Sequence, residues 1–352
     1  MLIMMSVVLA ASTLQSAGGM AFLVRIAEKL LRANPKAVTF VAPIIAFVFT
    51  FMAGTGNVLY SILPVIAEVA REAGVRPERP ISISVIASQH AVPASPISAA
   101  TVAMVALLGS SGVSVMTILA IVAPAVLLGL MIGAAAVCKR GKELSEDPEY
   151  LAKVNAGLFA EQTKAKAMGT EGGDTKQAKL IELIMLVVSA LMVIFCKAKP
   201  DEVIRTSVFR AGMMGVVTVF GLAWMSDTWI ANNLPYIKTT VAAVVQGAPW
   251  LFAFALFFVS ALTHSQGATV AALMPLGLSL GIDPLTLVCM YPAVCGYFVI
   301  PSTGVLLAGV AFDETGTTKI GKLVINHSYL LPGFVATFAN VVLAFGIRAV
   351  FF

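Results

Sequence analysis

The pattern of apolar and polar positions divides the chain into long apolar segments separated by short polar or basic stretches. One segment, FMAGTGNVLYSILPVIAEVA from Phe51 to Ala70, is interrupted in its middle by Gly54-Thr55-Gly56-Asn57. Neither of its arms can cross a bilayer alone, since a spanning helix needs about 20 apolar residues. Non-helical backbone is tolerated at membrane depth only where protein or a wet cavity surrounds it. The pattern therefore predicts a re-entrant hairpin over residues 38–70 with a polar tip.

Three other apolar segments are interrupted in similar ways. A spanning helix over 81–108 contains SQHAVPASPIS, in which each proline removes a backbone donor and frees a carbonyl group. A second hairpin over 250–280 breaks at HSQGAT, and a second spanning helix over 284–312 breaks at IPSTG. We therefore expect two re-entrant hairpins and two broken helices. Uninterrupted spans are predicted over 115–137, 209–224 and 324–345.

The second half of the chain repeats the order of the breaks in the first. One constant offset places Gly56 on Gly267 and Pro64 on Pro275, and a nearly equal offset places Ser95 on Ser302. Basic loops flank the first hairpin and are expected in the cytoplasm, whereas weakly charged segments flank the second. The prediction is an inverted repeat, with the substrate near the midplane between the tips and broken helices. The alternative is that Gly and Pro interrupt these helices by chance.

These boundaries divide the chain into four parts. We expect a first repeat over 1–138, a cytoplasmic, solvated polar loop over 139–179, a linking span over 180–196 and a second repeat over 197–352. One conflict remains in this scheme. The basic stretches at Lys139 and Lys197 both resemble cytoplasmic loops, which requires an even number of crossings between them, but the sequence offers only one. We favour the interpretation that segments are absent, before Met1 and before Leu180, over a new topology.

Composition sets the class of protein and excludes others. The 352 residues are 59% hydrophobic and only 12% charged, and the mean hydropathy is +0.94. This predicts an all-α polytopic membrane protein. The net charge of +5 lies in loops between apolar runs and indicates topology, not a nucleic-acid partner. An HExxH metalloprotease motif and paired intramembrane aspartates are both lacking, and the four cysteines form no C-x-x-C. We therefore expect neither an enzyme nor a metal or cofactor site.

The breaks supply the candidate substrate-binding residues. Backbone N–H groups at half-helix N-termini, together with hydroxyl and amide donors, can hold a carboxylate. Taken singly, each hydroxyl could instead bond to the preceding helical turn. The two amides are stronger candidates because a buried amide needs partners. The predicted binding residues are Thr55, Gly56, Asn57, Ser95, Pro96, Ser98, Ser265, Gln266, Gly267, Pro301, Ser302 and Thr303.

Four charged residues are further candidates. Glu28 and Arg32 are four apart on one helix and can pair, and Arg76 precedes the first broken helix. Each of the three could contact a dicarboxylate or only mark topology at the interface. Asp227, beside a break, is the strongest candidate for coupling to H⁺ or Na⁺, although it could equally cap a helix. His90 and His264 beside the breaks are more readily interpreted as structural histidines.

Several long blocks of this sequence resemble one transporter family. AEKLLRANPK, AGTGNVLYSILPVIAEVA, ASPISAA, AWMSDTWIANN and GTTKIGKLVINHSYLLPG are similar to the anaerobic C4-dicarboxylate transporters, the Dcu family, and more to its DcuA branch than to DcuB. The resemblance implies uptake or exchange of fumarate, succinate, malate and aspartate across a bacterial inner membrane. It also implies an ion-transporter-superfamily fold with an elevator-like transport domain. An ion or arsenite-type exchanger of similar fold is the alternative. A homo-oligomer and an added sensory role with a membrane kinase remain open.

Overall fold

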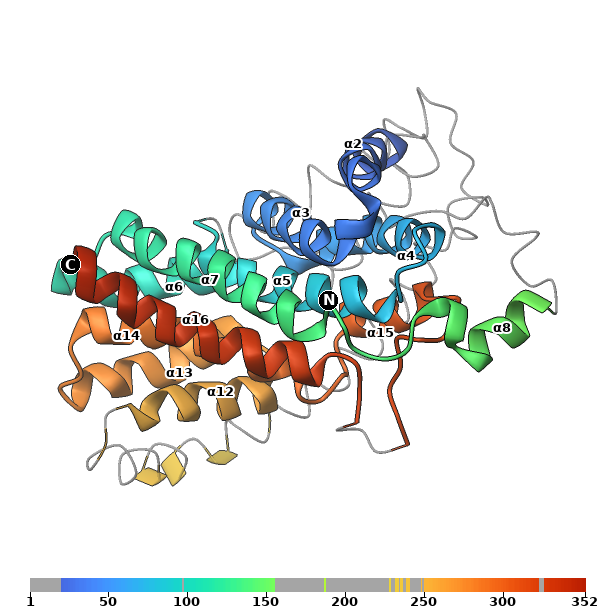
Figure 1. The fold of residues 1–352 in the computed structure, drawn as a ribbon. Coiled ribbons are helices and arrows are strands. Elements are labelled where there is room, and N and C mark those ends of the chain that lie inside the picture. Colours follow the sequence, from blue (N-terminus) through green and yellow to red (C-terminus); the bar gives the residue numbers. More distant parts are fainter. Residues whose placement is uncertain are drawn as a thin grey trace.

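Every regular element in the described part of this computed structural model is helical (Figure 1). The structure describes residues 20–96, 98–155, 250–322 and 326–352, with a few single positions between 187 and 248. The longer helices are α2 Met20–Ala33, α3 Val38–Ala53, α4 Leu63–Glu72, α5 Glu78–Ala94, α6 Ala99–Leu108, α7 Val115–Val137, α8 Pro148–Asn155, α12 Leu251–Thr263, α13 Gln266–Ser279, α14 Pro284–Met290, α15 Gly304–Phe312 and α16 Leu330–Phe351. Short 3₁₀ turns are η1 Pro35–Ala37, η2 Gly56–Ser61, η3 Gly109–Ser111, η4 Leu144–Glu146 and η5 Tyr291–Phe298.

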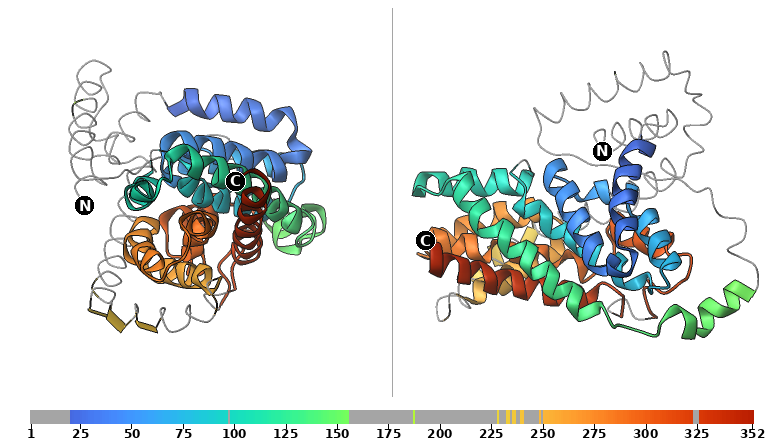
Figure 2. Two further views of the ribbon diagram at one scale, coloured as in Figure 1. Left: turned by 90° about the vertical axis from the view of Figure 1, so that its left-hand side faces the viewer. Right: turned by 45° about the horizontal axis from the view of Figure 1, so that its top comes forward.

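Helix α5 forms the centre of the molecule. All of its residues except Val92 are buried, and it packs against α3, α4, α6, α7, α15, α16 and η5. In two views α3 and α4 lie above this centre and α12–α14 lie below it (Figures 1 and 2). Helices from both halves of the chain therefore enclose α5.

Three helical segments are long and apolar enough to cross a membrane, namely Pro35–Ala53, Val115–Val137 and Leu330–Phe351. The first corrects the expectation that neither arm of the first hairpin could span. Pro35 starts a 3₁₀ turn that runs directly into α3, and this adds a turn to the arm. At 19 residues the combined segment is about 28 Å long, close to the thickness of the hydrocarbon core. The second arm, α4, has only 10 residues.

Helices α7 and α16 pack antiparallel through small residues. A Cβ on Gly129 would lie 2.0 Å from Asn340 Oδ1, and a Cβ on Gly133 would lie 3.3 Å from Ala336 Cβ. Glycines spaced four residues apart allow membrane helices to approach closely. The prediction of a span over 115–137 agrees with α7, but the final span was placed too early. It begins at Leu330 because Asn326, His327 and Ser328 belong to a loop whose polar groups bond to neighbours.

Exposed apolar side chains form stripes along several helices. They recur every four residues on α3, α12 and α16, at Phe40, Ile44, Val48, Phe254, Phe258, Leu262, Phe334, Phe338 and Val342. Residues at this spacing share one face of a helix. Exposed apolar side chains that line whole helix faces are typical of contact with lipid.

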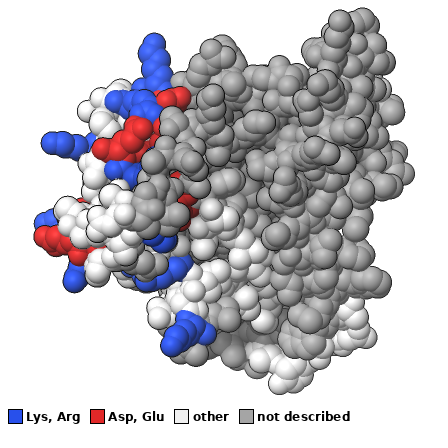
Figure 3. Space-filling model, turned by 90° about the vertical axis from the view of Figure 1, so that its right-hand side faces the viewer, with Lys and Arg blue, Asp and Glu red and all other residues white. Residues whose placement is uncertain are grey.

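Charged side chains gather at one end of the molecule, which we call the charged end and define by the loops 71–79, 139–147 and 313–328. Figure 3 shows Lys and Arg mixed with Asp and Glu there. At the opposite end Arg348 pairs with Asp283 at 2.8 Å. The start of the polar loop belongs to the charged end, since Leu144 is buried. The expectation that this loop is only solvated was therefore wrong for its first residues.

Several sequence predictions lie outside the described residues. These are the linking span over 180–196, the span over 209–224, the basic stretch after Lys197 and Asp227.

Candidate functional site

The first hairpin turns at a glycine. Helix α3 ends at Ala53 and is followed by Gly54, whose φ of 70° lies in the left-handed region that favours glycine. The chain then extends at Thr55, whose hydroxyl accepts a hydrogen bond from the Asn57 backbone at 3.4 Å. The 3₁₀ turn η2 and α4 follow. Asn57 and Gly56 are half-buried. The Gly-Thr-Gly-Asn sequence thus forms a break between two helices, as its composition predicts.

Hydroxyl groups attach this tip to α5. Thr50 donates to Ser88 Oγ at 3.0 Å, and Ser88 donates to the Gly56 carbonyl at 2.9 Å. At the end of α5, Ser95 donates to the Phe51 carbonyl at 2.7 Å. These bonds satisfy carbonyl groups that a broken helix leaves without partners. Ser95 and Gly56, both predicted as binding residues, therefore also hold the tip in place.

The second hairpin turns at His264, which has a φ of 52° and a ψ of 23°. Ser265 caps α13 by accepting from the Ala268 backbone at 3.2 Å. Gln266 reaches away from its own hairpin, because its Nε2 donates to the Gln89 carbonyl at 2.9 Å and lies 3.0 Å from Cys295 Sγ. A Cβ on Gly267 would meet nothing within 4 Å. The second tip is thus attached to α5 by an amide.

Both broken helices are interrupted where the sequence predicts. Between α5 and α6, Ser95 is extended and Ser98 caps α6 by accepting from the Thr101 backbone at 3.2 Å. Pro96 is half-buried at this break. Thr101 donates to the Pro93 carbonyl at 2.9 Å and lies 3.2 Å from the Tyr291 hydroxyl of η5. The first break is therefore in contact with the second broken helix.

The polar side chains at the break before α15 have fewer hydrogen-bond partners than those at the first break. Pro301 is buried and Ser302 is half-buried, with the Ser302 hydroxyl donating to the Ile300 carbonyl at 3.3 Å. Thr303 stands at the N-cap of α15, but its side chain makes no capping bond and its buried Oγ1 has no hydrogen-bond partner. The Tyr60 hydroxyl of the first hairpin lies against Gly304, 2.0 Å from where a Cβ would stand.

The tips and broken helices adjoin one another across the two halves of the chain. The first tip contacts α15 through Tyr60, and the second contacts α5 through Gln266. Helices α6, α13 and α15 and the 3₁₀ turn η2 begin at these breaks. Their N-termini carry partial positive charge, and the surrounding donors are neutral. Such a site can bind an anion without a fixed cation beside it.

Three of the charged candidates lie away from the breaks. Arg32 pairs with Glu28 at 2.6 Å, with Glu68 at 2.9 Å and with Glu72, and all four side chains are partly exposed. Hydrogen bonds to Glu72 and Glu28 raise the pKa of the Arg32 guanidinium. The predicted Glu28–Arg32 pair thus exists, but it joins α2 to α4 near the charged end.

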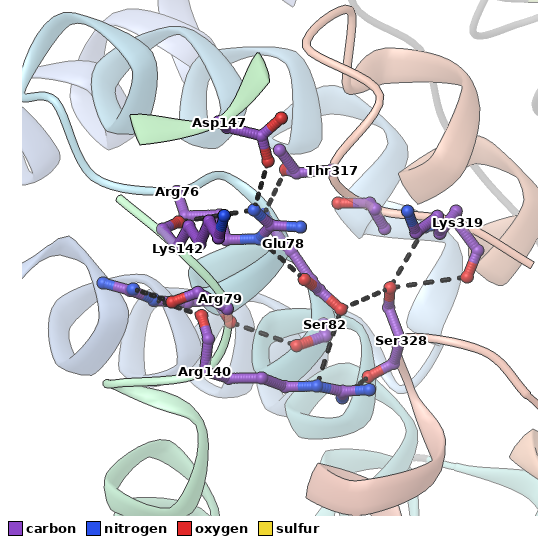
Figure 4. A network of polar contacts seen from close by, with 12 residues as sticks. Arg76, Glu78, Arg79, Ser82, Arg140, Lys142, Asp147, Thr317, Lys319 and Ser328 are labelled. Atoms are coloured by element: carbon purple, nitrogen blue, oxygen red, sulfur yellow. Dashed lines mark hydrogen bonds and ion pairs between the residues drawn. The ribbon is translucent and has the colours of Figure 1, made fainter. Parts of the chain in front are cut away.

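Arg76 takes part in a buried network at the charged end (Figure 4). Its guanidinium pairs with Glu78 at 2.9 Å and with Asp147 at 2.6 Å. Burial lowers the Arg76 pKa, but hydrogen bonds to Glu78 and Asp147 outweigh this effect and raise it. Arg79 pairs with Glu143 at 2.8 Å. Figure 4 shows side chains from three parts of the chain meeting there, namely Arg76, Glu78, Arg79 and Ser82, then Arg140, Lys142 and Asp147, and finally Thr317, Lys319 and Ser328.

The sequence analysis did not identify several residues that make contacts at the breaks. Thr50, Ser88, Gln89 and Cys295 all contribute contacts there. Their signal in the sequence is weak, since single hydroxyls and thiols are common in membrane helices, but the Ser-Gln-His run within an apolar helix marks α5. His90 bonds to the Ile86 carbonyl at 3.0 Å and Thr337 Oγ1 at 2.8 Å. Within the described residues no three His, Cys, Asp or Glu side chains gather as metal ligands.

Comparison with known proteins identifies the family. The profile of a family described as anaerobic C4-dicarboxylate membrane transporters matches residues 1–174 and 162–352. The chain belongs to the anaerobic C4-dicarboxylate membrane transporter family. Among curated relatives, the C4-dicarboxylate transporter DcuA of Escherichia coli K12 is 39% identical over 363 residues, covering 94% of this chain and 84% of that protein. DcuA of Wolinella succinogenes is 39% identical over 375 residues, covering 98% and 87%.

The DcuB branch is somewhat less similar. Anaerobic C4-dicarboxylate transporter DcuB of Escherichia coli O6:H1 is 35% identical over 378 residues, covering 95% of this chain and 84% of that protein. The resemblance to the family, and more to DcuA than to DcuB, is thus confirmed. Membership in this family makes the chain a multi-pass membrane transporter and not an enzyme.

Proposed function

We propose that this protein transports C4-dicarboxylates, taking up or exchanging fumarate, succinate, malate and aspartate across the bacterial inner membrane. Family membership supports the substrate class. The observation that carries the site is the meeting of two hairpin tips and two broken helices around α5, linked by the Gln266–Gln89 and Ser88–Gly56 hydrogen bonds. The N-termini of α6, α13, α15 and the 3₁₀ turn η2, together with neutral donors at these breaks, suit a dianion.

The proposed binding set consists of the tips and the breaks. Donors from Thr55, Gly56, Asn57, Ser265, Gln266 and Gly267 would face the unwound residues Ser95, Pro96, Ser98, Pro301, Ser302 and Thr303. The uncapped N-terminus of α15 and the unpartnered Thr303 hydroxyl support a carboxylate at that position. Glu28, Arg32 and Arg76 lie outside this set and form ion pairs at or near the charged end.

An inverted repeat is the second part of the proposal. The arms of the first hairpin begin and end beside Arg32 and Glu72, which pair near the charged end. The second hairpin ends just before Asp283, which pairs with Arg348 at the opposite end. Hairpins that enter from opposite ends support repeats over 1–138 and 197–352 and an elevator-type movement of the binding region. H⁺ or Na⁺ coupling through Asp227, a homo-oligomer and a sensor-kinase partner belong to the same proposal.

Uptake by reconstituted vesicles tests the function. We expect uptake of labelled succinate or aspartate by the purified protein, and weaker uptake by Asn57→Ala and Ser302→Ala with normal membrane insertion. Each substitution would leave substrate oxygens without a donor, which costs about 1–3 kcal/mol. Lack of uptake by the unmodified protein would contradict the proposed function. Unchanged uptake in both variants would contradict only the proposed binding set.

A further inference from the structure

Gln89, on α5, has a buried side-chain amide without a partner and lies near the second hairpin tip. Gln89 is only 3% exposed, and neither Nε2 nor Oε1 of its side chain has a hydrogen-bond partner. It lies on α5 between one and two turns before the break at Ser95–Ser98. A primary amide carries two donors and an acceptor, and leaving them unsatisfied in a protein interior is unfavourable. A ligand with matching groups would remove this cost.

The neighbours of Gln89 indicate where its side chain lies. Ser88 faces the first hairpin tip and His90 faces α16, as their hydrogen bonds to Gly56 and Thr337 show. Successive helical residues point about 100° apart, so Gln89 lies on the face between those two directions. Gln266 of the second tip and Cys295 of η5 reach the carbonyl of the same residue. Residue Gln89 therefore lies where the second tip and the second broken helix meet α5.

Asn340 provides a contrast. It is also fully buried, and both of its amide atoms lack a partner. Its Oδ1, however, lies against Gly129, at 2.0 Å from where a Cβ would stand, inside the close α7–α16 contact. Uninterrupted helices surround that position on both sides. Among the described residues, only Gln89 combines a buried, unpartnered amide with contact to a hairpin tip, and Asn340 is its matched control.

We propose that Gln89 contacts the substrate and favours C4-dicarboxylates that carry an amino or hydroxyl group at carbon 2. This inference rests on the proposed function. The Gln89 NH₂ group donates to a carboxylate oxygen, and Oε1 accepts from the 2-ammonium of aspartate or the 2-hydroxyl of malate. Succinate and fumarate satisfy the donors but leave Oε1 without a donor. Sites with polar groups that one substrate satisfies and its analogue does not discriminate strongly against the analogue.

Competition for uptake tests this role. In vesicles containing the full chain, uptake of labelled succinate would be competed by unlabelled aspartate, malate, succinate and fumarate. For Gln89→Leu we expect the concentrations of aspartate and malate needed for half-inhibition to rise about tenfold more than those of succinate and fumarate. Asn340→Leu should keep the original ranking. A folded Gln89→Leu transporter with the original ranking would overturn the proposal, whereas a wild-type protein without any uptake would overturn the proposed function instead.

A second variant decides the question if Gln89→Leu does not fold. In Gln89→Glu the new carboxyl group has nearly the same shape. When protonated, it keeps one donor and one acceptor; when ionised, it loses its donor and repels a dianion. We expect the ratio of variant to wild-type uptake to fall as pH rises through the pKa of this carboxyl. A ratio that does not change with pH, in protein that elutes as wild type in gel filtration, would overturn the proposal.

Discussion

His327 is held as a neutral ring by its two partners. The Tyr329 backbone N–H donates to Nδ1 at 3.2 Å, and Nε2 lies 3.1 Å from the Val299 carbonyl, which can only accept. One nitrogen is therefore an acceptor and the other a donor, which is the pattern of a neutral imidazole. Burial lowers the His327 pKa, and the nearby Arg140 charge lowers it further.

This geometry predicts a loss of stability in acid. As pH falls below about 6.5, the unfolded state binds a proton that the folded ring resists, so the free energy of unfolding falls by at most about 1.4 kcal/mol per pH unit. Thermal unfolding of the detergent-solubilised protein at pH 7.5 and 5.5 measures the effect. His327→Gln can donate to Val299 and accept from Tyr329, so its dependence on pH should be weaker. An equal dependence in the two proteins would contradict the assignment.

At the scale of elements, the sequence predicted the breaks well and the contacts poorly. Gly, Pro and polar residues inside apolar runs placed the breaks at 54–57, 95–98, 264–267 and 300–304, because these residues remove helical hydrogen bonds locally. The arm ending at Ala53 was predicted too short to span and α16 was predicted to start too early, because these limits depend on a 3₁₀ turn and on tertiary hydrogen bonds. Gln89 was missed for the same reason, since its importance comes from Gln266 and Cys295 far along the chain.

The contact between α7 and α16 predicts opposite effects of the same added methyl group. Gly129→Ala places a Cβ 2.0 Å from Asn340 Oδ1, and we expect a loss of about 1–3 kcal/mol from overpacking. Gly346→Ala on α16 meets nothing within 4 Å and should be neutral or stabilise the helix by up to about 1 kcal/mol. Thermal unfolding in detergent compares the two. Equal effects would show that this contact does not depend on small residues.

At the scale of the whole molecule, the crossings between Lys139 and Lys197 remain a prediction. The alignments with DcuA and DcuB run over 363, 375 and 378 residues, more than the 352 of this chain, so the relatives have internal residues that it lacks. The family profile matches in two pieces that meet at 162–174, within the polar loop. Both findings support an absent segment before Leu180.

Labelling from outside the cell tests this topology. With a membrane-impermeant maleimide, we expect Lys142→Cys and Lys197→Cys to remain unlabelled in intact cells, because basic loops favour the cytoplasm. Ser114→Cys, at the opposite end of α7 from the charged end, should be labelled and serves as the positive control. Labelling of Lys197→Cys from outside would mean that one span separates the two basic stretches and that the repeats are not inverted as proposed.

The network at the charged end determines which helices can separate. Glu78 at the start of α5 bonds to Ser328 before α16 at 2.8 Å, Arg79 bonds to the Arg140 carbonyl after α7 at 2.8 Å, and the Glu78 backbone donates to Thr317 after α15 at 3.1 Å. Pulling these helices apart would break these bonds, and the two that involve a charged side chain contribute about 1.5–3 kcal/mol each. We therefore expect helices α5, α7, α15 and α16 to stay together during a transport cycle.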